Sequence, residues 1–308
     1  DKPMRDAFIA ALHDIAAEDD RVMLLSADIG FAVFDKFRDD YPGRYMNLGV
    51  AEANMIGVSA GLALSDMRPF AYTIIPFLTM RAFEQIRVDV CAQNQPVVIV
   101  GVGGGLSYGV LGPTHHATED LAVMRALPNM TIVMPSDPAE ARAATRAAHD
   151  HDGPVYIRLG KNGEPALTDY SNFQIGKAAE VRSGSDVTIV SGGPILKVAL
   201  EAADALEQDG LSCRVINIHT VKPIDADAIL QAAVETNAMI VLEEHSIIGG
   251  LGSAVSEILA ENAVGKPFKR IGIPDMFCHT VGSQEYHWQE QGFTAGEVAG
   301  SARILMQI

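Results

Sequence analysis

One carboxylate, Glu52, stands out as a residue placed to do proton chemistry. It is the only charged residue between Arg44 and Asp66, and it follows a short extended segment, 45–48. A helix of small residues is expected to begin at Glu52 and to continue through residue 63. A carboxyl group in such apolar surroundings is suited to hold a proton for another group. The alternative is a first-turn glutamate that only complements the helix dipole.

Two adjacent histidines, His115 and His116, follow the segment Gly112-Pro113-Thr114. Histidine titrates near neutral pH, so one member of the pair is a candidate for proton transfer to or from a substrate. A metal site is disfavoured, because adjacent side chains rarely point the same way and the sequence places no third ligand. Taken alone, the pair is more typical of a solvated loop.

The elements that must position these residues alternate between helix and strand. Apolar runs follow helical patterns along the whole chain, which favours parallel sheets with helices on their faces. Asp137 is expected to cap a helix whose first position is Pro138. Strands are predicted at 22–26, 70–75, 96–101, 131–134, 155–158, 187–190, 213–217, 239–242 and 268–273, and helices at 4–17, 81–87, 121–126, 195–208, 226–235, 251–262 and 295–306.

The pattern divides into two α/β units. A polar stretch without periodicity, 161–186, is interpreted as a linker that contains a short edge segment. We therefore predict two open, mostly parallel-sheet domains, at residues 1–165 and 186–308, joined by a linker at 166–185. Ligands are expected at the carboxyl ends of the strands in such sheets.

Composition narrows the function classes. The formal net charge of −16 argues against nucleic-acid phosphates and against an anionic membrane as partners. No apolar run reaches the about 18 residues that a membrane-spanning helix needs, and no signal peptide is seen. The three cysteines stand far apart, which indicates reduced thiols in a cytoplasmic protein.

Two motifs carry a resemblance to a known family. The segment from Asn47 to Met55, around Glu52, and the segment from Gly112 to His115 resemble motifs of the transketolase family. These enzymes depend on thiamin diphosphate, and 1-deoxyxylulose-5-phosphate synthase is similar as well. The stretch 243–253 resembles the signature of the family's C-terminal domain. The resemblance implies a pyrimidine-binding domain at 1–165 and a transketolase C-terminal domain at 186–308.

The resemblance also implies roles for individual residues. Glu52 would hydrogen-bond a nitrogen of the cofactor's aminopyrimidine ring and promote its reactive tautomer, and His115 would face the substrate. Phe77 would stack on the aminopyrimidine, with Tyr72 as the alternative because the spacing varies between families. Arg81 is expected only to fix helix packing and a subunit surface. The paired Glu243 and Glu244 are interpreted as structural.

The part that binds the cofactor's diphosphate is not apparent in the sequence. In the family this part carries a Gly-Asp-Gly motif with ligands for Mg²⁺, and no Gly-Asp-Gly occurs here. We therefore expect a partner alpha chain to hold the diphosphate and Mg²⁺, with the active site at the interface and with no metal site on this chain. Two alpha and two beta chains are expected.

Three residues bear on the substrate. Arg5 and Lys161 match anion-binding positions of the family and would hold a distal phosphate, sulfonate or carboxylate, unless they are ordinary surface charges. Leu111 stands where sugar-phosphate enzymes place an aspartate that recognises a hydroxyl. Because leucine accepts no hydrogen bond, the substrate is expected to be less hydroxylated or less phosphorylated than usual.

The sequence thus predicts the beta component of a two-chain transketolase that moves a two-carbon ketol unit from a ketose to an aldehyde. One rival is the beta subunit of a 2-oxo-acid dehydrogenase first component, or a related acyl-transferring decarboxylase. Another is a non-catalytic subunit that stabilises a partner. A nicotinamide oxidoreductase is disfavoured, because Leu106 replaces the third glycine of the G-x-G-x-x-G pattern that begins at Gly101.

Overall fold

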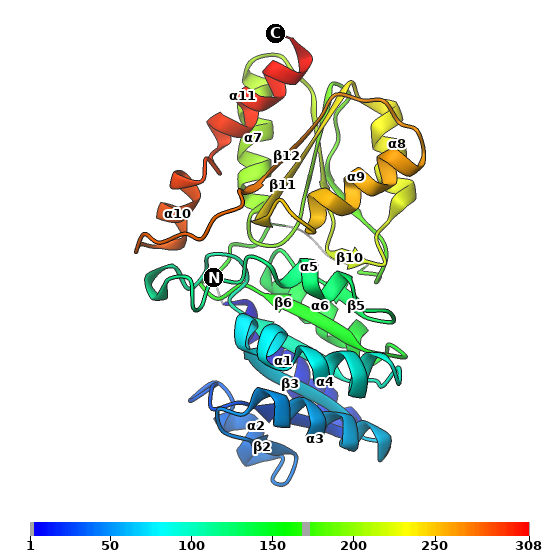
Figure 1. The fold of residues 1–308 in the computed structure, drawn as a ribbon, viewed down its shortest axis with the longest axis vertical. Coiled ribbons are helices and arrows are strands. Elements are labelled where there is room, and N and C mark those ends of the chain that lie inside the picture. Colours follow the sequence, from blue (N-terminus) through cyan, green and yellow to red (C-terminus); the bar gives the residue numbers. More distant parts are fainter. Residues whose placement is uncertain (1–2, 168–172, 308) are drawn as a thin grey trace.

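The computed structural model describes residues 3–167 and 173–307 and shows two α/β units, one above the other in Figure 1. Residues 168–172, within the predicted linker, lie outside the described part. Each unit has a mostly parallel sheet between helices, which confirms the predicted fold class.

Seven strands of the described residues form the first sheet. Its neighbours are parallel, with pairs such as Leu24 opposite Phe70, except that the edge strand β10 runs antiparallel to β5. The order across the sheet is β10 (Thr220–Lys222), β5 (Thr131–Val133), β6 (Val155–Leu159), β4 (Val98–Val102), β3 (Arg68–Ile74), β1 (Val22–Ser26) and β2 (Tyr45–Asn47).

Five strands of the described residues form the second sheet. The edge segment predicted within the linker region is β7, which pairs antiparallel with β9, while the other neighbours are parallel. The order is β12 (Phe268–Ile273), β11 (Ala238–Ser246), β8 (Val187–Ser191), β9 (Cys213–Asn217) and β7 (Ala179–Arg182).

Helices cover both faces of each sheet. Strand β1 shows why: Val22 and Leu24 face the cluster that contains α1 and α6, whereas Met23 and Leu25 face the cluster that contains α3. The helices of the first unit are α1 (Met4–Glu18), α2 (Asp35–Asp40), α3 (Glu52–Leu64), α4 (Phe83–Gln85), α5 (Asp120–Arg125) and α6 (Pro138–His149). Those of the second unit are α7 (Leu196–Gln208), α8 (Ala226–Glu235), α9 (Leu251–Glu261), α10 (Gln284–Glu290) and α11 (Ala295–Met306).

One predicted helix has a different form. In place of a regular helix over 81–87, the chain makes two π-helical segments, Phe77–Arg81 and Ile86–Cys91, on either side of the short α4. A π-helical turn contains an extra residue, and such turns are frequent at functional sites. The N-cap prediction is confirmed, since the Asp137 carboxylate accepts a hydrogen bond from the Glu140 amide at 2.8 Å.

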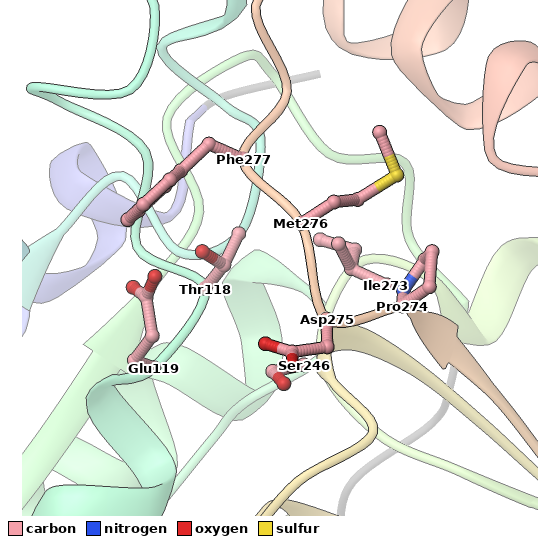
Figure 2. A pocket seen from close by; sticks show the side chains of 8 residues that line it. All are labelled: Thr118, Glu119, Ser246, Ile273, Pro274, Asp275, Met276 and Phe277. Atoms are coloured by element: carbon pink, nitrogen blue, oxygen red, sulfur yellow. The ribbon is translucent and has the colours of Figure 1, made fainter.

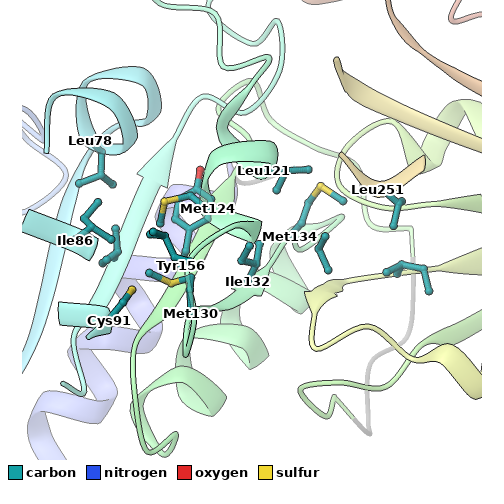
Figure 3. Packing of buried hydrophobic residues seen from close by; sticks show 14 of the residues in the cluster. Leu78, Ile86, Cys91, Leu121, Met124, Met130, Ile132, Met134, Tyr156 and Leu251 are labelled. Atoms are coloured by element: carbon teal, nitrogen blue, oxygen red, sulfur yellow. The ribbon is translucent and has the colours of Figure 1, made fainter. Parts of the chain in front are cut away.

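A continuous apolar core joins the two units. Leu121 and Met124 of α5 and Met134 after β5 belong to the same buried cluster as Ile218 and Leu251 of the second unit (Figure 3). Because buried side chains pack closely, the two units hold each other in place.

The crossing strand β10 adds a second connection. It lies in the sequence predicted to form the second domain, yet it completes the first sheet beside β5. The Lys222 ammonium donates hydrogen bonds to the carbonyls of Arg125, at 3.0 Å, and Leu127, at 2.5 Å. The first sheet therefore takes its strands from residues 22–159 and 220–222, and the second sheet takes its strands from 179–217 and 238–273, so the domain boundaries at 165 and 186 remain a prediction.

Candidate functional site

Glu52 lies at the start of α3, directly after a turn that is fixed by Asn47 and Gly49. The Asn47 side-chain oxygen accepts hydrogen bonds from the amides of Asp28 and Gly49, both at 3.0 Å. Gly49 has a φ of +72°, a conformation that favours glycine. The chain then enters α3 with Glu52 as its first residue, 3% exposed.

Arg81 is the direct partner of Glu52. Its Nη1 atom donates to both carboxylate oxygens of Glu52, each at 3.3 Å. The Arg81 side chain is 51% exposed, whereas that of Glu52 is 4% exposed. Arg81 was expected to fix helix packing and a subunit surface. Its ion pair with Glu52 joins the π-helical segment to the start of α3 and also places Arg81 at the candidate site. A buried carboxylate needs such a partner, because an unpaired buried charge is costly.

The same guanidinium covers the ring of Phe77. The Arg81 Cζ atom lies 4.1 Å from the ring centroid, and the half-buried Phe77 also contacts the His115 ring, with centroids 5.0 Å apart and a T-shaped arrangement. Phe77 and Arg81 are the two ends of one π-helical segment, which sets them side by side. Phe77 therefore presents an aromatic face next to the Glu52 carboxylate.

Tyr72, the alternative stacking residue, lies elsewhere. Its ring is stacked on Phe8, with centroids 5.7 Å apart, and meets Phe34 edge-on at 4.9 Å. It is 3% exposed and belongs to the core beneath α1, and this burial raises the pKa of Tyr72. The placement favours Phe77 over Tyr72 as the stacking residue.

His115 is held by a tight turn. Its amide donates to the Gly112 carbonyl at 2.9 Å, and Gly112 has φ 73° and ψ −165°, a region open essentially only to glycine. The Thr114 hydroxyl lies 2.9 Å from Nδ1 of His115. Partial burial, together with the nearby charge of Arg81, lowers the pKa of His115. The imidazole is therefore neutral near pH 7 and able to accept a proton.

Tyr108 links His115 to the two predicted anion-binding residues. Its ring centroid lies 5.8 Å from that of His115, and the Lys161 Nζ atom lies over it at 4.6 Å. Burial raises the pKa of Tyr108, and the charge of Arg5 partly offsets this. The guanidinium of Arg5 itself pairs with the Asp6 carboxylate at 3.2 Å.

Glu164 fixes the segments that carry both cations. This buried carboxylate accepts hydrogen bonds from the Met4 amide and from the Asn162 amide, each at 3.1 Å. These amides neighbour Arg5 and Lys161 in the sequence. Glu164 therefore holds the segment that carries Arg5 next to the segment that carries Lys161.

Leu111 lies at the surface of the same loop. It ends a short 3₁₀ turn, Gly109–Leu111, and is 49% exposed. Val110 beside it is 64% exposed. The loop therefore presents apolar side chains, and no hydrogen-bond acceptor, at the position where Leu111 was predicted to face a substrate.

The paired glutamates at the junction are structural, as expected. Glu243 accepts hydrogen bonds from the amides of Leu251, at 2.7 Å, and Gly252, at 3.0 Å, which start α9. Glu244 accepts from the Leu106 amide at 2.8 Å and from the Gln284 amide group at 2.9 Å. Glu244 thereby connects α10 of the second unit to the glycine-rich loop of the first.

The pocket in Figure 2 lies apart from the candidate site, and the described residues include no group of metal-binding side chains. A cavity of about 170 Å³ at the junction contains none of the predicted site residues and is lined by Thr118, Glu119, Ser246, Ile273, Pro274, Asp275, Met276 and Phe277 (Figure 2). Within 3–167 and 173–307, no three His, Cys, Asp or Glu side chains are grouped to hold a metal ion. In the same ranges no helix combines the length and apolar character that crossing a membrane requires.

Sequence reasoning missed three residues of the site: Arg81, Tyr108 and Glu164. The signal for Arg81 was its position four residues after Phe77, which puts the two side chains on one side of a helical turn. Tyr108 and Glu164 stand in irregular loops, where spacing says nothing about which side chains meet.

Comparison with known proteins agrees with this geometry. The family model of the transketolase pyrimidine binding domain matches residues 1–164, and that of the transketolase C-terminal domain matches residues 176–298. The 6-deoxy-6-sulfo-D-fructose transketolase subunit SqwH of Clostridium sp. (strain MSTE9) is 41% identical over 308 residues, covering 99% of this chain and 94% of that protein. One of the subunits of the apulose-4-phosphate transketolase of Phocaeicola vulgatus is 37% identical over 274 residues, covering 88% of this chain and 87% of that protein.

A solved structure is similar along its whole length. A split gene transketolase, described as an inactive beta4 tetramer, aligns with a TM-score of 0.89 and 37% identity, covering 99% of this chain and 98% of that chain. By contrast, this chain covers 46% of the 1-deoxy-D-xylulose-5-phosphate synthase of Heliobacterium modesticaldum, to which it is 35% identical. The chain therefore belongs to the transketolase family and contains its pyrimidine-binding and C-terminal domains, as the motifs around Glu52 and His115 predict.

Proposed function

We propose that this chain is the beta component of a two-chain, thiamin-diphosphate-dependent transketolase. It would help to transfer a two-carbon ketol unit from a ketose donor to an aldehyde acceptor. The observation that carries the proposal is the convergence of three predicted residues: the buried Glu52 carboxylate and the Phe77 ring both contact Arg81, and the Phe77 ring contacts the His115 imidazole.

The residues present fit an aminopyrimidine ring. Such a ring is flat and carries N–H groups, so it needs an aromatic face and a buried acceptor side by side. Phe77 and Glu52 offer these two features, and a flat N–H donor, the Arg81 guanidinium, already binds to both. Glu52 would hold the pyrimidine nitrogen and Phe77 would stack on the ring.

The chain's own residues would hold and orient the cofactor and the substrate, and would move protons to and from them. When bound, thiamin diphosphate supplies a carbon nucleophile for covalent catalysis. Glu52 would set the tautomer of the pyrimidine by sharing a proton with its ring nitrogen. His115, neutral near pH 7 and half-buried, would accept or return a proton at the substrate's hydroxyl or carbonyl oxygen.

A partner alpha chain would supply the remainder of the site. We infer that it binds the diphosphate and Mg²⁺, because the sequence of this chain has no Gly-Asp-Gly motif. The names of the relatives, which are subunits, and the split gene transketolase support a two-chain enzyme. Two alpha and two beta chains remain our proposal for the assembly.

The substrate is proposed to end in an anionic group. Lys161 lies over Tyr108, and Glu164 binds the backbone amides next to both Lys161 and Arg5. The two named relatives act on a sulfonated sugar and on a sugar phosphate, respectively. The apolar Leu111 loop favours a substrate with fewer hydroxyl groups along its length than a common ketose phosphate.

The test combines cofactor binding and turnover. Thiamin-diphosphate binding with Mg²⁺ would be measured by calorimetry for this chain alone and for its complex with a candidate alpha chain. The complex would then be assayed with 6-deoxy-6-sulfo-D-fructose, apulose 4-phosphate and fructose 6-phosphate as donors. We expect tight binding only in the complex, and turnover fastest with one of the first two donors.

Variants of this chain make the assay specific. Glu52→Gln in the complex should lower turnover by at least about 100-fold, while Glu261→Gln, at an exposed position on α9, should leave it unchanged. Full activity of Glu52→Gln would show that the chain is a non-catalytic subunit. Activity with a lipoyl-domain acceptor but not with aldehydes would indicate a 2-oxo-acid dehydrogenase component instead.

A further inference from the structure

Arg81 makes two contacts at the candidate site. Its guanidinium donates to both oxygens of Glu52 at 3.3 Å, and its Cζ atom lies 4.1 Å above the ring centroid of Phe77. A flat cation with N–H groups thus bonds a buried carboxylate and stacks on an aromatic ring at the same time.

These two contacts are the ones that the aminopyrimidine ring is proposed to make. That ring would also stack on Phe77 and share a hydrogen with Glu52. The Arg81 guanidinium covers one face of Phe77, and a pyrimidine ring that stacked on that face while bonded to Glu52 would have to displace it. Without the cofactor ring, the Glu52 carboxylate, 4% exposed, is paired with Arg81.

We propose that the Arg81 guanidinium occupies the aminopyrimidine position in the cofactor-free chain and must leave Glu52 and Phe77 before the cofactor can bind. This inference rests on the proposed function. Arg81 is then a gate on the cofactor site: it satisfies the buried carboxylate when the chain is without cofactor, and it competes with the cofactor for the same two partners.

The surroundings of Arg81 allow it to move. Its side chain is 51% exposed, so the guanidinium can swing into solvent without crossing packed side chains. The π-helical segment ends at Arg81, and the next residue, Ala82, has φ −103° and ψ 15°, outside the helical range. By contrast, the buried Leu78 and Thr79 fix the segment to the core, so only the side chain needs to change position.

Competition of this kind weakens cofactor binding by the fraction of time that the gate is open. The ion pair, exposed only on the Arg81 side, and the stacking contact are each worth a few-fold in a binding constant. Removing both at once should therefore tighten thiamin-diphosphate binding by roughly three- to thirty-fold.

The test uses the complex with the alpha chain. Thiamin-diphosphate affinity would be measured by calorimetry with Mg²⁺ for the unmodified chain, Arg81→Ala, Arg81→Lys and the matched control Arg87→Ala. Arg87 is exposed in the neighbouring π-helical segment. We expect tighter binding for Arg81→Ala, an intermediate value for Arg81→Lys, and no change for Arg87→Ala.

A salt series separates gating from a structural effect. Because salt screens the exposed guanidinium of Arg81, the ratio between the affinities of Arg81→Ala and the unmodified chain should fall toward one as salt increases. The alpha chain's diphosphate contacts are the same in both proteins and cancel in this ratio. A change that merely loosened the fold would not follow salt in this way.

Each outcome decides between the two proposals. Unchanged or weaker binding by Arg81→Ala, while the unmodified complex binds, overturns the gate and leaves the proposed function standing. Absence of binding by the unmodified complex overturns the proposed function and the gate with it. If Arg81→Ala does not fold, a crystal structure of the cofactor-loaded complex decides: Arg81 away from Glu52 supports the gate, and Arg81 still on Glu52 refutes it.

Discussion

Glu243→Gln should change how the stability of this chain depends on pH. The Glu243 carboxylate is 1% exposed and accepts two hydrogen bonds from the start of α9, next to the junction between the two units. Burial raises the pKa of Glu243 to about 7, although those two amides and the charges of Arg158 and Arg270 act in the opposite direction. The neighbouring His245 stays neutral, because burial lowers its pKa to about 4.

The sign and size follow from these values. The folded chain keeps the proton of Glu243 to a higher pH than the unfolded chain, whose carboxyl has the ordinary value of 4.5. The associated stability is present below pH 4.5 and is lost as pH rises through about 7. A difference of this size corresponds to about 3 kcal/mol of the free energy of unfolding. Because glutamine cannot ionise, the stability of the variant does not fall in this way as pH rises.

The assay is urea unfolding of the chain at fixed protein concentration between pH 5 and pH 8, followed by the fluorescence of its single tryptophan, Trp288. Trp288 is 8% exposed in the second unit, so its signal reports on this region. The introduced glutamine has one carbonyl acceptor in place of two, which lowers stability by a similar amount at every pH. The stability difference between Glu243→Gln and the unmodified chain should therefore rise with pH by up to about 3 kcal/mol. A difference that stays constant, as expected for the exposed control Glu261→Gln, would refute the reasoning.

Two further predictions concern the site itself. Phe77→Ala in the complex should weaken thiamin-diphosphate binding by up to about tenfold through lost stacking, whereas Tyr72→Leu, which removes the other candidate ring, should leave it unchanged; the reverse result in calorimetry, with both variants folded, would assign stacking to Tyr72. Lys161→Met should raise KM for a donor with a terminal sulfonate or phosphate by roughly tenfold, with little effect on kcat, because it removes one charged hydrogen bond to the anion; equal effects on a donor without the anion would contradict this role.

Much of the fold follows from local sequence patterns. The strands 213–217 and 268–273 and the helices 226–235 and 295–306 lie where apolar periodicity placed them. Buried parallel strands read as short apolar runs, and a capping Asp137 before Pro138 marks a helix start on its own. Such features depend on neighbours in the sequence, so the sequence alone is enough to find them.

The parts that were not predicted depend on distant contacts. The three-residue strand β10 has no periodicity to detect and exists because β5 offers it an edge. The two π-helical segments differ from a regular helix by single residues, which no propensity scale resolves. Glu52 and His115 were found through short motifs, whereas the role of Arg81 depends on where the Glu52 helix packs against the Phe77 segment.

The crossing of β10 into the first sheet has a consequence for how the chain is made. A ribosome releases the chain from its N-terminus, and the β5 edge has no partner until residue 222 has emerged. A fragment cut at residue 165 would keep that edge bare, and bare edges recruit other chains into aggregates. Synthesis therefore cannot complete the sheet of the first unit before residues 220–222 have emerged. If the gene is divided at the linker, the fragment that contains the first sheet should be insoluble. A fragment that also includes residues 220–222, which cover the β5 edge, should avoid this.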